Sequence, residues 1–236
     1  MALVRLICDL EDLPRKDITM LFTCRFDATY DEDTIAYASN KFTILRHKTK
    51  RRQTGWPQGP NQMMACSYEY LVENWRRNRL PNIDCVLFVE ADCVPLRKGW
   101  IDELYAEFKT SGKRVVGAWL KKGDANCEHI NGNCVVAMDF WKKCPGMFHP
   151  PSKGGWDAAL AYAILPNGYP SKLIWSDYQL GMPNNPWRGD DFLWEVKRYG
   201  CPDNALYGQD LSPCWFHGIK TMDGIKAVRK RLLNES

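Results

Sequence analysis

Residues 83–95 read IDCVLFVEADCVP, a run of mostly apolar residues followed at once by two acids and then a proline. Residues 83–89 form the most continuous apolar run in the chain, which predicts a central strand of a parallel sheet buried on both faces. Alternation along an extended chain would turn the carboxylates of Glu90 and Asp92 to the same side. We therefore expect an oxygen-rich site at the carboxyl end of a buried strand.

Strand and helix signals alternate on both sides of this run. Runs rich in β-branched and aromatic residues predict strands, and apolar residues at helical spacing predict helices. The predicted strands are 18–24, 42–45, 115–120 and 133–138. The predicted helices are 32–39, one from Asn61, one from Gly99, 156–164, one from Arg188 and 223–233. This order predicts an α/β fold with ligands bound at the carboxyl ends of its strands.

The chain has 236 residues, of which 45% are hydrophobic and 25% charged. That length and apolar content predict one globular domain over residues 1–236 and exclude a disordered tail. No window approaches the roughly 18 consecutive apolar residues of a membrane span, and acids follow the amino terminus closely. We expect a soluble, cytoplasmic protein without a signal peptide. The net charge is 32 − 28 = +4, which permits a polyanionic partner without requiring one.

Ten cysteines are present, yet no two have CxxC spacing, and several lie inside apolar runs. This pattern favours reduced thiols that behave as small hydrophobic residues. A zinc site from Cys127, His129 and Cys134 is an alternative, although the paired-knuckle spacing is missing.

Glu90 and Asp92 have two interpretations. Closely spaced carboxylates can hold a divalent cation, but acids also commonly solvate a strand end. The wider context FVEADCVPLRKGWIDEL (88–104) resembles the DxD region of GT-A glycosyltransferases.

Three further segments follow in the order of that family. They are HINGNC (129–134), similar to the segment beside the donor sugar; RGDDFLW (188–194), similar to the xED motif; and FHGIK (216–220), similar to the carboxyl-terminal metal and phosphate segment. The resemblance implies a GT-A, Rossmann-like mixed sheet flanked by helices, and transfer of a hexosyl or pentosyl group from a nucleotide sugar. Glu90 stands where Asp is more usual, and Asp190 where Glu is more usual.

The resemblance also implies roles for single residues. Asp92 would be the principal carboxylate on Mn²⁺ or Mg²⁺, Glu90 would face the ribose or the metal, and His217 would complete the coordination. Lys220 would neutralise the diphosphate. Such cationic groups stabilise charge on a leaving diphosphate.

Three acids are candidates for the catalytic group. Asp191 matches the base position of the family, Asp190 precedes it, and Asp157 in GGWDAAL is a rival base or an acceptor-binding residue. If the enzyme inverts, Asp191 would take the proton of the acceptor hydroxyl. Retention and inversion both stay open.

The nucleotide sugar is expected to contact residues from several segments. The set is Thr23, Arg25 and Asp27 near the base, Trp56, Gly59 and Asn61 in the same cleft, and Glu90, Asn131, Gly132 and Lys220. A helix beginning near Asn61 would offer free backbone amides to phosphate.

Each assignment has a structural alternative. Trp56 could be a hydrophobic plug, His217 an ordinary buried histidine and Lys220 part of a basic surface. Asn131-Gly132 could be a simple turn, and Asp190 and Asp191 could interact with a helix dipole.

The acceptor is suggested only by charge. The basic segment 46–52 and the basic final helix favour a hydroxymethylated pyrimidine in double-stranded phage DNA, with UDP as the expected carrier. Ten tryptophans offer stacking surfaces for a flipped base. Surface-polysaccharide or glycoconjugate assembly is the alternative within the same class. A nucleotidyltransferase and a non-enzymatic nucleic-acid-binding protein are alternatives from other classes.

Overall fold

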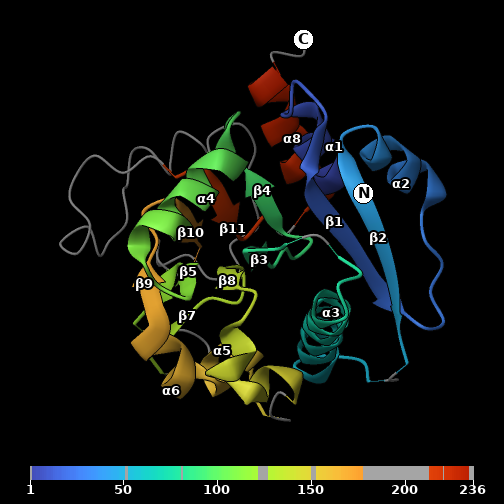
Figure 1. Ribbon diagram of the computed structural model, residues 1–236. Coiled ribbons are helices and arrows are strands. Elements are labelled where there is room, and N and C mark those ends of the chain that lie inside the picture. Colours follow the sequence, from blue (N-terminus) through green and yellow to red (C-terminus); the bar gives the residue numbers. More distant parts are fainter. Residues whose placement is uncertain are drawn as a thin grey trace.

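The computed structural model describes residues 2–50, 53–80, 82–121, 127–149, 153–177, 213–219 and 221–233. Short strands occupy the centre and helices surround them (Figure 1). Both parallel and antiparallel strand pairs occur. The expected mixed α/β architecture with flanking helices is thus confirmed.

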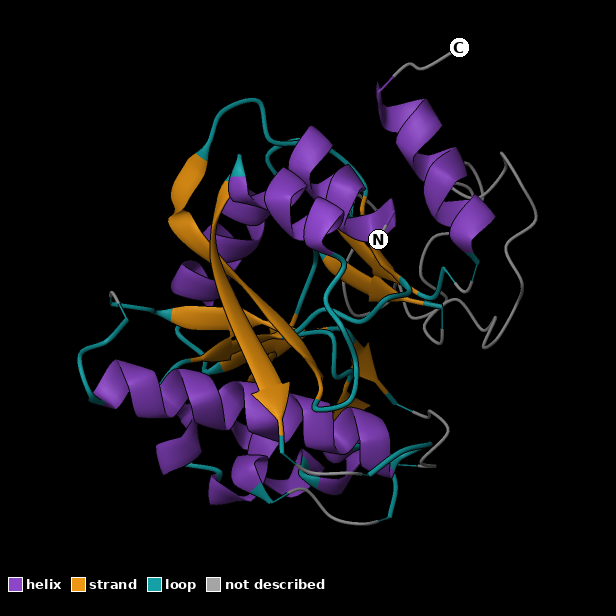
Figure 2. Cartoon of the chain, turned by 90° about the vertical axis from the view of Figure 1, so that its right-hand side faces the viewer, coloured by secondary structure: helices purple, strands orange, loops and turns teal. Residues whose placement is uncertain are grey.

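The amino-terminal part is built on two long parallel strands, β1 (Arg15–Arg25) and β2 (Phe42–Thr49), joined through α2 (Glu32–Ser39). Asp31 caps α2 by accepting a hydrogen bond from the amide of Thr34. The pair is prominent as the two long strands of Figure 2. All three elements were predicted, and β2 extends past residue 45 to Thr49. An unpredicted helix, α1 (Ala2–Asp9), packs against the carboxyl-terminal helix.

The remaining strands form three hydrogen-bonded groups. The first has the order β3 (Cys85–Leu87), β8 (Val135–Ala137), β5 (Val115–Gly117), β9 (Gly168–Pro170). The second has the order β10 (Ile174–Ser176), β11 (Trp215–His217), β4 (Cys93–Pro95). The third pairs β6 (Trp119–Leu120) with β7 (His129–Ile130).

The prediction for residues 83–89 was wrong in its details. β3 covers only Cys85–Leu87, lies at the end of its group, pairs antiparallel with β8 and is partly buried. A short apolar run does not reveal the direction of its partner or how many neighbours it has. The strand ends at Leu87, one further ladder bond runs from the amide of Phe88 to the carbonyl of Cys134, and the acids follow in a turn, outside the alternation of the strand.

Most described helices match the predicted positions. They are α3 (Gln58–Arg76), α4 (Trp100–Ser111), α5 (Trp156–Ala159), α6 (Ala161–Ile164) and α8 (Met222–Leu233), with 3₁₀ turns at Phe140–Lys142, Pro145–Phe148 and Leu165–Asn167. The predicted helix 156–164 is broken at Leu160. α3 begins before Asn61, with Pro57 at its N-cap position and no side-chain cap. No helix in these described ranges is long and apolar enough to cross a bilayer.

The group containing β4 and β11 positions the site. The two strands run antiparallel and place His217 opposite Cys93, directly after Asp92. Trp100 stacks on Trp215 with ring centroids 4.7 Å apart, and both rings are buried. This packing anchors the start of α4 and the β4–β11 pair to the same core.

Candidate functional site

Glu90, Asp92 and His217 converge at the ends of β4 and β11. One ligand atom from each lies within 4.8 Å of the others. The Nε2 atom of His217 is 3.3 Å from Asp92 Oδ2 and 3.6 Å from Glu90 Oε2. The His217 side chain is 6% exposed, that of Asp92 19% and that of Glu90 49%. His217 therefore forms the buried side of the cluster, and Glu90 forms the side that faces solvent.

The two acids approach His217 through a turn and not through strand alternation, so that part of the prediction was wrong. The turn between β3 and β4 closes with a hydrogen bond from the amide of Cys93 to the carbonyl of Glu90, at 3.2 Å. The amides of Gly218 and Ile219 donate to the carbonyl of Asp92 at 3.0 and 2.8 Å. Backbone bonds thus join the acidic turn to the segment that follows His217.

The orientation of His217 is set by groups behind it. Ser176 Oγ lies 3.2 Å from His217 Nδ1 and donates to Asp177 Oδ1, also at 3.2 Å. Because the hydroxyl proton points to Asp177, the oxygen accepts from Nδ1–H. With Nδ1–H held by Ser176, a neutral His217 would direct its Nε2 lone pair to the carboxylates, as a metal-binding histidine requires.

Gly218 makes this arrangement sterically possible. Its φ is +130°, and a Cβ there would lie 2.6 Å from Asp177 Cγ. A larger residue would collide with the acid beside His217 and would be strained in backbone conformation.

The electrostatics of the cluster fit a cation. Desolvation raises the pKa of Glu90, the carboxylates of Asp92 and Asp157 raise it further, and His217 and Asn133 oppose the shift. A divalent cation among these groups would stabilise the ionised carboxylate. Carboxylate and imidazole groups both serve as ligands of divalent cations. In the part of the chain that the structure describes, this is the one group of three or more acidic, histidine or cysteine side chains with metal-binding proximity.

A second acid, Asp157, lies beside the segment 131–133. The amide of Gly132 donates to Asp157 Oδ2 at 2.8 Å, and His129 Nε2 is 4.0 Å from the same oxygen. A Cβ on Gly132 would lie 3.2 Å from Trp156 Nε1 and 3.4 Å from Asp157 Oδ2. Asn131-Gly132 therefore packs against Asp157 and Trp156. The segment has more contacts than a simple surface turn would have.

Asn61 does not serve as the expected helix start with free amides. Its own amide donates to the carbonyl of Pro57 at 3.1 Å. Its side chain donates to the carbonyl of Gly154 at 2.9 Å and accepts from the amide of Trp156 at 2.8 Å. Asn61 is buried, so it braces α3 against the segment that leads to Asp157.

Trp56 is 69% exposed, so the hydrophobic-plug alternative was wrong. Its ring lies 3.3 Å from the position that a Cβ on Gly155 would take, and Asp157 Oδ1 lies 2.6 Å from that position. Trp56 is thus an exposed aromatic ring on the Asp157 side. Gly59 is in the first turn of α3, where its amide donates to the carbonyl of Gly55.

Three residues expected near the nucleotide base lie at the end of β1. Thr23 Oγ1 accepts from Ser67 Oγ of α3 at 2.7 Å, and Arg25 pairs with Asp27. β1 and β2 form a hydrogen-bonded pair separate from the strands of the Glu90–Asp92–His217 cluster.

Several predicted residues lie outside the described residues, namely Lys220, Asp190 and Asp191 with the rest of 188–194. The zinc alternative gains nothing from the geometry: His129 Nδ1 is 2.9 Å from the carbonyl oxygen of Cys127, and the three side chains form no metal-type group within the described ranges. The nine described cysteines are all free thiols.

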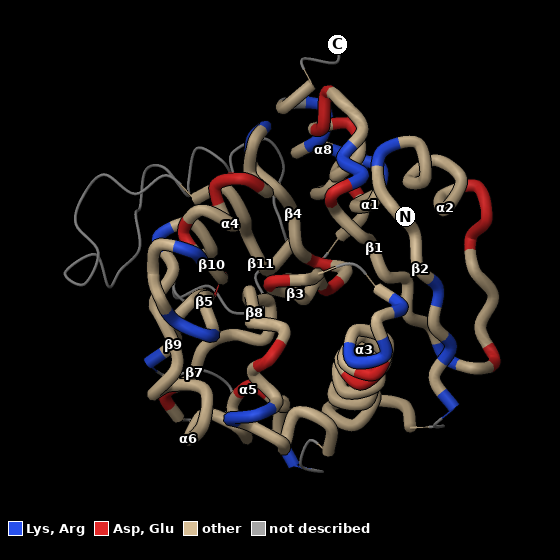
Figure 3. The backbone as a smooth tube through the Cα atoms, viewed as in Figure 1, with Lys and Arg blue, Asp and Glu red and all other residues tan. Residues whose placement is uncertain are grey.

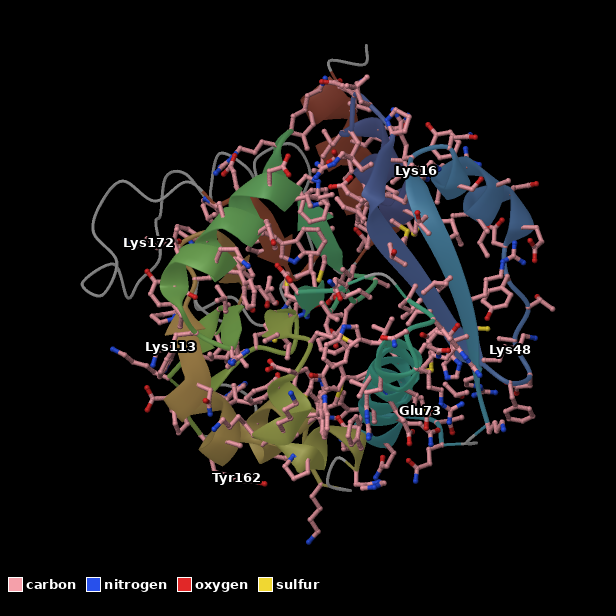
Figure 4. The ribbon with its side chains drawn as sticks, viewed as in Figure 1. Lys16, Lys48, Glu73, Lys113, Tyr162 and Lys172 are labelled. Carbon is pink, nitrogen blue, oxygen red and sulfur yellow. The ribbon has the colours of Figure 1, made fainter. Side chains whose placement is uncertain are left out.

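The two basic segments lie far apart. Lys48 is near the lower end of β2, whereas α8 lies at the top beside α1 (Figures 3 and 4). Arg46 pairs with Glu32 at 2.8 Å, and the cations of Arg46 and Lys48 lie over the ring of Tyr30. Arg229 of α8 pairs with Asp9 at 2.8 Å.

Sequence analysis missed two polar residues of the site, Ser176 and Asn133. Ser176 is the last residue of a three-residue strand, and its neighbours give no motif signal. Asn133 stands two residues after Asn131 in the segment that was singled out, so its proximity to Asn131-Gly132 was the available clue.

No protein-family model matches the chain, and no curated protein matches it. Among solved structures, the chain is similar to the apo crystal structure of mouse xyloside xylosyltransferase 1. The TM-score is 0.47 and the identity 12%, over 92% of this chain and 91% of that chain. A likeness this remote carries no conclusion about the activity of the present chain.

Proposed function

We propose that this protein is a metal-dependent glycosyltransferase that moves a hexosyl or pentosyl group from a nucleoside-diphosphate sugar to a hydroxyl. The observation that carries the proposal is the convergence of Glu90, Asp92 and His217, with ligand atoms within 4.8 Å. The order of the motifs at 129–134, 188–194 and 216–220 adds support from the sequence. UDP is the proposed carrier.

Asp92 and His217 would hold Mn²⁺ or Mg²⁺, with Glu90 on the open side of the cluster. When bound, the cation supplies positive charge that offsets the charge of the leaving diphosphate. Lys220 is proposed to add a second positive charge there. His217 contributes by presenting Nε2, which Ser176 keeps in the required tautomer.

The acceptor hydroxyl needs a proton acceptor. As its oxygen forms a bond to the anomeric carbon, the bond from that carbon to the diphosphate oxygen breaks and the hydroxyl proton leaves. We propose Asp157 as the base among the described residues, because backbone amides fix both of its oxygens at 2.8 and 2.9 Å. Each oxygen keeps a further lone pair for the proton. Asp191, with Asp190 beside it, is the rival from the sequence.

Release of nucleoside diphosphate tests the reaction class. The protein is incubated with Mn²⁺ and a panel of nucleotide sugars without acceptor, since slow donor hydrolysis reports the donor. We expect release from one donor, lost with chelator and in Asp92→Ala, and retained in Asp223→Ala, whose side chain is exposed on α8. Failure to bind any nucleotide sugar with Mn²⁺ would overturn the proposal.

For the acceptor we propose a hydroxymethylated pyrimidine in DNA. Support comes from the basic end of β2, with Lys48 and Lys50, and from the exposed ring of Trp56 as a stacking surface. Transfer to hydroxymethylated DNA, compared with unmodified DNA of the same sequence, tests this choice. Transfer only to simple saccharides would instead support glycoconjugate assembly.

A further inference from the structure

Asn133 is a buried amide, 1% exposed, between the ends of β7 and β8. Its Oδ1 atom accepts from the amide of Glu90 at 2.9 Å and from the thiol of Cys93 at 2.7 Å. Its Nδ2 atom donates to Glu90 Oε2 at 3.3 Å and to Asn131 Oδ1 at 3.2 Å. Asn133 therefore contacts both the backbone and the carboxylate of Glu90.

These contacts define the orientation of the amide. The oxygen faces two donors and the nitrogen faces two acceptors, so a flipped amide would lose all four hydrogen bonds. The backbone amide of Asn133 also donates to Asn131 Oδ1 at 3.1 Å. Asn131 Oδ1 thus accepts hydrogen bonds from both the backbone amide and the side chain of Asn133. Asn133 in turn bonds to the backbone amide and the carboxylate of Glu90.

Glu90 needs such support more than its partners do. His217 and Asp92 are largely buried, whereas the Glu90 side chain is 49% exposed and follows the end of a strand. A glutamate with three rotatable bonds loses considerable freedom when it is fixed on one ligand position. The oxygen that Asn133 contacts, Oε2, is the same oxygen that lies 3.6 Å from His217.

We propose that Asn133 is a positioning residue that fixes the Glu90 carboxylate in the metal cluster, and that it acts on the metal through Glu90. The inference rests on the metal site of the proposed function. Asn133 lies in the segment 129–134 that resembles the family, but the resemblance implies no role for this residue. Groups behind metal ligands typically contribute 10–100-fold to metal affinity.

The test measures Mn²⁺ affinity by electron paramagnetic resonance of free Mn²⁺, alone and with UDP, on the full chain. We expect Asn133→Ala to weaken Mn²⁺ binding about 10-fold. The matched control is Asn167→Ala, which removes a side-chain bond to the carbonyl of Ala163 far from the cluster. Its affinity is expected to equal that of the wild type.

A double-mutant cycle separates positioning from general support of the fold. In a Glu90→Ala background, Asn133→Ala is expected to cause a smaller further loss, because the carboxylate is gone and only the bonds to the amide of residue 90 and to Cys93 remain. If Asn133→Ala does not fold by circular dichroism, Asn131→Ala replaces it and is expected to give a smaller loss in the same direction. That variant leaves Asn133 without its own anchor.

Two results would overturn the inference: wild-type affinity in the folded Asn133 or Asn131 variant, or an equal loss with and without Glu90. Absence of Mn²⁺ binding by the wild type, alone and with UDP, would overturn the metal site together with the inference. Mn²⁺ binding with the expected cycle but no turnover of any donor would leave Asn133 as a positioning residue and contradict only the glycosyltransferase proposal.

Discussion

The β4–β11 region and the β1–β2 region both carry polar side chains at strand ends, but they hold them differently. In the first, Ser176 supports buried His217, and two backbone amides bind the carbonyl of Asp92. In the second, charged side chains form exposed pairs such as Arg25 with Asp27. Exposed pairs contribute little and rearrange easily. The difference indicates that the first region holds its polar side chains in fixed positions, whereas the charged side chains of the second can rearrange.

Asp157→Asn is expected to produce the largest effect. Loss of a general base lowers turnover by about 10²–10⁴-fold, whereas Mn²⁺ affinity should stay near that of the wild type because Asp157 lies outside the ligand cluster. Donor and acceptor kinetics together with Mn²⁺ titration check both parts. Unchanged transfer would remove Asp157 as the base and favour Asp191.

Ser176→Ala tests whether the hydroxyl of Ser176 orients His217 in the β4–β11 region. Without the hydroxyl, the Nδ1–H of His217 loses its acceptor, and we expect Mn²⁺ affinity to fall about 10-fold. Ser39→Ala on α2, whose hydroxyl bonds the carbonyl of Ala36, is the control. Equal Mn²⁺ affinity in both variants would show that Ser176 does not orient His217.

The sequence predicted the residues of the Glu90–Asp92–His217 cluster but not the reason why they converge. The acids and His217 were identified from motifs, but the reason given for their convergence, strand alternation, was wrong because residues 90–92 form a turn. Alternation is a local rule, whereas the antiparallel β4–β11 pairing joins residues more than 100 positions apart. The helix expected to begin at Asn61 begins at Gln58, and the partners of the Asn61 side chain, Gly154 and Trp156, are remote in sequence.

Asn61→Ala tests whether that residue braces the fold, as the structure indicates, or binds phosphate. The change removes the acceptor of the buried Trp156 amide, whereas the carbonyl of Gly154, which is exposed, only exchanges its donor for water. We expect the free energy of unfolding to fall by about 1–3 kcal/mol, measured by urea denaturation, with donor affinity retained under native conditions. A loss of donor affinity at unchanged stability would restore the ligand-binding role.

The smallest expected effect concerns the two basic segments. If DNA binds along β2, Lys48→Glu should weaken binding and reduce the slope of log affinity against log salt by about one. Lys230→Glu on α8 should leave both unchanged, because α8 lies at the other end of the molecule (Figure 1). Equal effects of the two changes would contradict the separation of the basic surfaces.

The central claim is that Glu90, Asp92 and His217 together bind a divalent cation. Titration of Mn²⁺ against the wild type, Asp92→Ala and Asp223→Ala, followed by electron paramagnetic resonance, tests it most directly. We predict one Mn²⁺ site in the wild type and in Asp223→Ala. In Asp92→Ala we predict that Mn²⁺ affinity falls by more than about 100-fold, which exceeds the loss typical of residues that only support a metal ligand. Equal Mn²⁺ binding by all three proteins would contradict the account.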